Sequence, residues 1–238
     1  RDQIIDQLWP DLTPAQGERD FKIAYSALCN VLEPARQRNA PSAYVLRDGM
    51  LYGLRPQADL WLDTAVFEQS IQLGDGLFDQ NKKAALAHYQ AALDLYRGDF
   101  LLDFHVEGAP EFEAWQLGER EHYRQLALEL LERLGDALLQ ERNYAQAIDT
   151  FAQLLALEPW YERGHRRLMV AYSRVGDFNR ALVQYEQCQQ VLEDELGVPP
   201  MPETQALYER IRAAREGQPP ALPVDALQFV GRTAELDE

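Results

Sequence analysis

A pattern of residues in the second half of the chain repeats at an interval of 34 positions. The first copy contains Leu138, Tyr144, Ala147 and Phe151, and the second contains Tyr172, Phe178, Ala181 and Tyr185. In each copy a small residue is followed four positions later by an aromatic one, so the two side chains lie on the same face of a helix. The alanine lets a second helix approach closely, and the ring fills the space beside that contact. The interval predicts two successive helical hairpins.

An interval of 34 positions with these residue types is typical of the tetratricopeptide repeat. Gly135 leaves the first helix room for its partner, and Pro159 ends the second helix after Leu157. A single hairpin of this kind cannot bury its apolar face alone, so neighbouring hairpins stack and leave a concave surface. We therefore expect most of the chain to be a docking platform rather than a site of chemistry.

Acidic residues are distributed unevenly along the chain. The 238 residues carry a formal net charge of -16, which opposes binding to the DNA backbone. Residues 1–62 hold seven Lys/Arg and eight Asp/Glu, whereas the remainder holds 16 basic and 31 acidic residues. Only the amino-terminal quarter is expected to approach DNA without strong repulsion.

Motifs for catalysis or metal binding do not stand out. The four histidines show no ligand spacing with one another or with Cys29 and Cys188, and we expect both cysteines to be buried free thiols. The sequence has neither a phosphate-binding loop nor a Gly-x-Ser-x-Gly nucleophile motif. No apolar run approaches the roughly 20 residues of a membrane helix. We expect a cytoplasmic, non-enzymatic chain that binds no cofactor, metal or membrane.

The amino-terminal segment is predicted to form two helices followed by a β-hairpin. The predicted helices span 2–9 and 18–32, and the predicted strands span 43–47 and 50–54 around an Asp48-Gly49 turn. Residues 10–17 are interpreted as a turn and a polar linker. The apolar side of the second helix is predicted to comprise Phe21, Ile23, Ala24, Leu28, Val31 and Leu32. Two helices and a hairpin in this order form the back half of a winged helix.

The rest of the chain is predicted to be helical. Predicted helices span 63–72, 81–97, 110–140, 143–157, 160–174, 177–195 and 202–216. Turns are predicted at Asp75-Gly76 and at Arg97-Gly98-Asp99, and residues 217–223 are interpreted as a Pro-rich linker and hinge.

The predicted fold class is therefore mainly α, with a partial winged helix and its β-hairpin wing followed by a tetratricopeptide-like solenoid of helical hairpins. The predicted domains are a winged-helix part over 1–62, a helical domain over 63–216, and, over 217–238, a linker and the start of a further domain.

Several short motifs occur in a fixed order across residues 63–212. They are Ala91, Leu93, the run from Tyr96 to Leu101, Trp115, the two repeats, Glu195-Leu196-Gly197-Val198, Pro202-Glu203-Thr204, Leu207 and Tyr208. In this order they resemble the bacterial transcriptional activator domain of antibiotic-regulatory-type activators.

Motifs on either side extend this resemblance. Leu8-Trp9-Pro10-Asp11, Leu32-Glu33-Pro34 and the Asp48-Gly49 turn resemble the back half of a response-regulator type of winged helix. Phe229-Val230-Gly231-Arg232 with Glu235-Leu236 resembles the entrance to a nucleotide-binding switch domain of large multidomain regulators. The resemblance implies an order of DNA-binding domain, helical activator domain and a switch domain that lies outside this chain.

The second helix is predicted to be the recognition helix, which in a winged helix lies in the major groove. The predicted DNA-binding residues are Arg19, Lys22, Tyr25, Ser26 and Asn30 on this helix and Arg47 on the wing. Family members usually carry a run like Ser-Arg-Leu-Arg-Arg where this chain has Ser26-Ala27-Leu28-Cys29-Asn30. Three expected cations are missing, which matters because phosphate contacts by Lys and Arg supply the non-specific affinity.

Two functions are therefore open. The first is a transcription regulator fragment that binds promoter DNA through the winged helix and docks a protein partner on the helical platform; the family implies RNA polymerase as that partner. The second is a signalling scaffold, in which a degenerate winged helix serves packing, dimerisation or contacts with the nucleotide-binding switch domain of the same protein.

Overall fold

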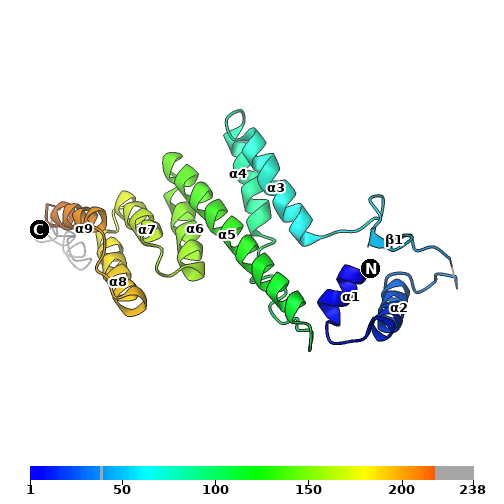
Figure 1. The fold of residues 1–238 in the computed structure, drawn as a ribbon. Coiled ribbons are helices and arrows are strands. Elements are labelled where there is room, and N and C mark those ends of the chain that lie inside the picture. Colours follow the sequence, from blue (N-terminus) through cyan, green and yellow to red (C-terminus); the bar gives the residue numbers. More distant parts are fainter. Residues whose placement is uncertain (38–39, 218–238) are drawn as a thin grey trace, which may run out of the picture. The chain divides into compact units, whose positions relative to one another are not determined.

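The structure of the chain is a computed structural model that describes residues 1–37 and 40–217. Its helices are α1 (Asp2–Leu8), α2 (Pro14–Leu32), α3 (Asp63–Leu77), α4 (Lys82–Leu93), α5 (Pro110–Gln140), α6 (Tyr144–Leu157), α7 (Glu162–Arg174), α8 (Phe178–Leu196) and α9 (Pro202–Glu216) (Figure 1). The strands β1 (Val45–Asp48) and β2 (Leu51–Leu54) pair as an antiparallel hairpin. The predicted fold class, mainly helical with a β-hairpin wing and tetratricopeptide-like hairpins, is confirmed. Contacts group the residues into two compact units, one comprising Arg1–Leu134 and one that begins at Gly135.

Helix α2 begins earlier than the sequence predicts. Pro14 occupies its first turn, and Oε1 of Gln16 accepts a hydrogen bond from the backbone N–H of Thr13 at 3.1 Å. The predicted linker is thus a helix start, because proline is welcome in the first turn and capping satisfies free N–H groups. Gly17 then meets α1, since a Cβ there would stand 2.5 Å from Cγ2 of Ile5.

The wing is a short hairpin whose turn lies one position later than the sequence predicts. Val45 pairs with Leu54, and Asp48 pairs with Leu51. Gly49 has a φ of 59°, in the left-handed region that glycine adopts without a steric penalty. The hairpin is confirmed, but its two turn residues are Gly49 and Met50 rather than Asp48 and Gly49, because Asp48 still pairs with Leu51.

Helices α3 and α4 pack as a hairpin whose bounds differ from those that the sequence predicts. Asp75 and Gly76, predicted to form a turn, both lie inside α3, and α4 ends at Leu93 rather than at residue 97. A Cβ on Gly74 would stand 2.3 Å from Cε1 of Tyr89, and the Tyr89 hydroxyl donates a hydrogen bond of 2.6 Å to Oδ1 of Asp75. The turn prediction is wrong because these residues pack one helix against the other.

The predicted repeats lie in the second unit, from the end of α5 to α8. Ala147, Phe151 and Ala181 are 0% exposed, as expected for residues at the closest helix contacts. A Cβ on Gly135 would stand 2.5 Å from Cζ of Phe151, so the glycine does leave room for the ring. Helix α6 ends at Leu157, two residues before Pro159.

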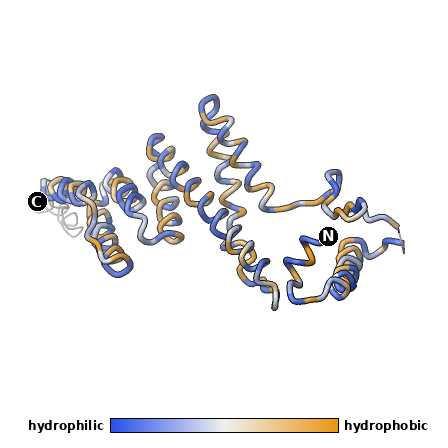
Figure 2. The backbone as a smooth tube through the Cα atoms, in the orientation of Figure 1, coloured by the Kyte–Doolittle hydropathy of each residue, from blue (hydrophilic) through white to orange (hydrophobic). Residues whose placement is uncertain are grey.

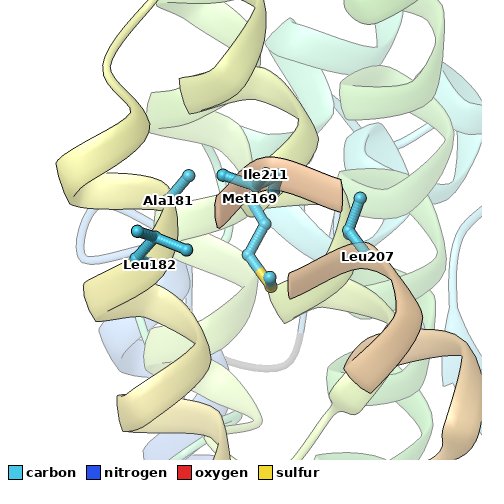
Figure 3. Close-up of a cluster of buried hydrophobic side chains, with 5 residues drawn as sticks. All are labelled: Met169, Ala181, Leu182, Leu207 and Ile211. Atoms are coloured by element: carbon cyan, nitrogen blue, oxygen red, sulfur yellow. The ribbon is translucent and has the colours of Figure 1, made fainter. Parts of the chain in front are cut away.

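The apolar core of the second unit includes a cluster where α7, α8 and α9 meet. Its buried members are Met169, Ala181, Leu182, Leu207 and Ile211 (Figure 3). Hydrophobic and hydrophilic segments alternate along the backbone of the helices (Figure 2), as expected when each helix buries one face. Cys29 and Cys188 are buried and free, as predicted.

Some predictions fall outside the described residues. These are the linker beyond Gly217 and the motif at residues 229–236. The predicted domain limits at residues 62 and 216 also stay predictions.

Candidate nucleic-acid interface

The predicted DNA-binding residues of α2 occupy two sides of the helix. Arg19, Ser26 and Asn30 are exposed on one side, because intervals of seven and four residues return to the same face. Lys22 lies at the edge of this side, and the side chains of Arg19 and Lys22 are 70% and 67% exposed. Tyr25 is half-buried on the other side.

The predicted apolar side of α2 is partly wrong. Ile23 and Val31 are 62% and 77% exposed, whereas Phe21 is 5% exposed. Ile23 follows Phe21 by two positions, which is about 200° around the helix axis, so the two cannot share a face. Ala24 and Leu28 are exposed as well. We call the exposed side formed by Arg19, Ile23, Ser26, Ala27 and Asn30 the reading face.

Aromatic rings fasten α2 to the wing. The ring of Tyr52 on β2 meets those of Phe21 and Tyr25 edge to face, with centroids 4.8 Å and 5.2 Å apart. Burial raises the pKa of Tyr25 above its ordinary value. The guanidinium carbon of Arg47, which pairs with Tyr52 across the hairpin, lies 5.7 Å from the centroid of that ring. One cluster thus positions both the helix and the wing cation.

The connection from α2 to the wing is organised by Glu33. Its carboxylate accepts a hydrogen bond of 3.0 Å from the backbone N–H of Ala43 and another from the hydroxyl of Ser42. These bonds lower the pKa of Glu33, with the Ala43 N–H as the largest cause. The hydroxyl oxygen of Ser42 in turn accepts a hydrogen bond of 2.9 Å from the backbone N–H of Val45, the first residue of β1.

Carboxylates already neutralise part of the cationic charge at this interface. Glu18 Oε1 lies 3.0 Å from Nη1 of Arg1 and 3.2 Å from Nζ of Lys22. Arg19 pairs with Asp20 at 3.0 Å. Exposed ion pairs of this kind contribute only about 0–1 kcal/mol, so a DNA phosphate can replace the carboxylate with a small loss of free energy.

The absence of the arginines that the family resemblance implies affects this surface less than the sequence suggests. Ala27 and Asn30 face outward, but the side chain of Cys29 is 0% exposed. Cys29 lies in the interior of this winged helix, so a side chain at this position does not reach a groove. The reading face therefore lacks two of the expected arginines rather than three.

A second surface, at which the sequence predicts no site, is formed in part by the segment that connects α4 to α5. Gln116 on α5 donates hydrogen bonds to the carbonyl oxygens of Leu101 and Phe104, at 2.7 Å and 2.9 Å. Arg120 donates to the carbonyl oxygens of residues 100–102, at 2.6 Å to 3.0 Å. These bonds hold Leu101 at a φ of 50°, a left-handed conformation that is rare outside glycine.

The segment held in this way borders an open cleft of about 780 Å³. Its walls include Trp61, Phe67, Tyr96, Arg97, Leu101 and Tyr123. Leu102 and Phe104 are 59% and 51% exposed at its edge. The turn signal at Arg97-Gly98-Asp99 indicated only that the chain changes direction, so it did not reveal that α5 side chains would hold the segment.

The described residues combine a winged-helix segment with tetratricopeptide-like helical hairpins. Residues 62–212 match the family model of the bacterial transcriptional activator domain, and the chain belongs to that family. No helix among the described residues is long and apolar enough to cross a membrane.

Relatives of the chain are regulators of transcription. It is 28% identical over 256 residues to the regulatory protein AfsR of Streptomyces coelicolor, covering 99% of this chain and 24% of that protein. It is 30% identical over 224 residues to the transcriptional regulator RedD of the same organism, covering 93% of this chain and 60% of that protein. The chain thus spans less than two thirds of the length of either relative.

A solved structure shares the fold. Mycobacterium tuberculosis EmbR superposes with a TM-score of 0.65 and 22% sequence identity, over 90% of this chain and 54% of that chain. At this identity the similarity establishes the fold alone.

Proposed function

We propose that this chain is the DNA-binding and partner-docking part of a transcription regulator. The observation that carries the proposal is the exposed reading face of α2. The ring contacts of Tyr52 hold the other side of this helix against the wing. A helix of this kind suits the major groove, and Arg47 on the wing suits the neighbouring phosphates. Membership in a family of transcriptional activator domains and the two regulator relatives support the proposal.

A gel-shift titration of the purified chain against duplexes from the promoter of its own gene tests this function. We expect a complex at low salt that weakens as salt rises. Arg19→Ala combined with Lys22→Ala should lower the affinity about tenfold on every duplex, because both cations contact phosphates. The matched control is Arg210→Ala with Arg215→Ala, two exposed arginines of α9, which should leave binding unchanged. A chain that gives no shift at low salt would not be a DNA-binding protein.

For the protein partner we propose RNA polymerase, docked on the helical hairpins with the exposed Leu102 and Phe104 at the edge of the cleft among the contacts. Surface-binding measurements with purified polymerase test this step. Leu102→Ser with Phe104→Ser should weaken binding, whereas Val175→Ser, at a 50% exposed apolar residue outside the cleft, should not. If both variants bind the polymerase equally well, the docking site does not include this cleft.

A signalling scaffold is the second candidate, favoured by Ala27 and Asn30 at positions where the family usually carries cations. In that case the winged helix contacts protein, and the nucleotide-binding switch domain of the same polypeptide is the proposed partner. A reporter assay in the full-length regulator separates the candidates. Intact regulation by the Arg19→Ala, Lys22→Ala variant would favour the scaffold, and lost regulation would favour DNA binding.

A further inference from the structure

The reading face of α2 has an apolar centre. Ile23 is 62% exposed there, and Ala27 one turn further along is exposed too. Arg19 and Asn30 lie on the same side of the helix, within about 40° of Ile23 around the axis. The middle of the face that meets DNA in the proposed function therefore offers methyl groups, with one cation and one amide near its ends.

These groups match particular base pairs. In the major groove, thymine alone presents a methyl group, on C5, and apolar side chains contact it. Asparagine pairs with the N6 and N7 atoms of adenine, whereas arginine and lysine pair with guanine. Apart from Arg19 the reading face carries no cation, and Ala27 and Asn30 lie toward its carboxyl-terminal end, so its centre and carboxyl-terminal end suit A·T pairs.

We propose that Ile23, supported by Ala27, is the specificity-determining residue of α2 and that it contacts the 5-methyl group of a thymine in the major groove. This inference rests on the proposed binding of DNA by α2. It names the kind of site that the chain selects: a duplex with an A·T pair opposite the middle of the helix, and an adenine within reach of Asn30.

In vitro selection from a random pool of duplexes, with the intact chain, first identifies the preferred site. Each thymine of that site is then replaced in turn by deoxyuridine, which removes the methyl group and keeps the base pairing. We expect one position at which this replacement lowers the affinity about fourfold, since burial of one methyl group is worth about 0.8 kcal/mol. The other thymines should tolerate the replacement.

Variants of the chain then assign the effect to a side chain. With Ile23→Ala, the thymine and deoxyuridine duplexes should bind equally. Ile23→Thr keeps one methyl group and should keep part of the difference. Val31→Ala is the matched control, because Val31 is 77% exposed on the same helix but lies about 80° away around the axis; it should keep the full difference. Because these side chains are exposed, circular dichroism should show the same folded state for all.

Two outcomes would overturn the inference in distinguishable ways. If a site is selected but no thymine is sensitive to loss of its methyl group, or if the sensitivity persists in Ile23→Ala, the role of Ile23 is wrong and DNA binding stands. If no sequence is enriched and no duplex is retained, the proposed function fails together with the inference.

Discussion

His165 shows how a single buried residue links the second unit to pH. It is 4% exposed, its Nε2 lies 2.8 Å from the carbonyl oxygen of Pro159, and its Nδ1 lies 2.7 Å from Nε2 of Gln184. The neutral tautomer with the proton on Nε2 satisfies both contacts, donating to Pro159 and accepting from Gln184. Burial lowers the pKa of His165 below 6.5, its ordinary value.

The lowered pKa predicts the direction in which stability depends on pH. The unfolded chain binds this proton more readily, so the contribution of His165 is fully present above about pH 6.5 and is lost as the pH falls toward the lower, folded pKa. Urea unfolding at pH 7.5 and 5.5 should show a smaller loss of stability in His165→Gln than in the wild type. His122→Gln, at an exposed histidine, should behave like the wild type. An equal loss of stability in all three proteins would exclude His165 as the cause of the pH dependence.

Two glycines of α5 give a matched pair of substitutions. A Cβ at Gly135 would stand 2.5 Å from the ring of Phe151, whereas nothing lies within 4 Å of a Cβ at Gly118. Gly135→Ala should destabilise the chain by about 1–3 kcal/mol through overpacking. Gly118→Ala should stabilise it by about 0.5–1 kcal/mol, because alanine is the better helix former. Thermal unfolding measures both, and a stabilising Gly135→Ala would contradict the packing of α5 on α6.

At the scale of elements, the wing depends on α2 for its position. Tyr52→Ala removes both ring contacts, each worth about 0.5–1.5 kcal/mol beyond its buried area. Amide hydrogen exchange in β1 and β2 should become at least about tenfold faster, since about 1.4 kcal/mol corresponds to that factor. The helices should remain protected.

Leu51→Ala is the control for this substitution, because Leu51 neighbours Tyr52 on β2 and is 72% exposed. Its hairpin should exchange like that of the wild type. If the Tyr52→Ala hairpin also exchanges at the wild-type rate, the ring cluster does not hold the wing.

The elements also differ in how far they follow from the sequence. The repeats were predictable because Ala147 and Ala181 stand 34 positions apart in otherwise regular helices. The α3–α4 hairpin uses the same glycine–alanine–aromatic contact, but Ala85 follows Gly74 by 11 positions where Ala147 follows Gly135 by 12. Ala85 and Ala147 stand 62 positions apart, which is not a multiple of 34, so a fixed interval does not reveal the first hairpin.

The candidate interface was predictable in part. Its cations lie where helix periodicity places them, but periodicity did not decide which apolar residues face inward. The sequence predicts Ile23 on the apolar side because its type is usually buried, whereas its exposure depends on where Phe21 and Tyr52 meet. That contact joins residues 31 positions apart, which no local pattern reveals.

For the whole molecule, charge decides how strongly DNA is held. Residues 1–62 are nearly neutral and the remainder is strongly acidic, so affinity rests on a few cations. Arg19, Lys22 and Arg47 are the exposed cations of α2 and the wing. Three phosphate contacts predict a plot of log affinity against log salt with a slope of about -3, shallower than for a recognition helix with a full row of arginines.

The most direct test of this account is that slope, measured by fluorescence anisotropy with the wild type and with the Arg19→Ala, Lys22→Ala variant on one selected duplex. Two lost contacts should bring the slope from about -3 to about -1. Equal slopes for the two proteins, or no binding by the wild type at low salt, would contradict the claim that α2 carries the DNA interface.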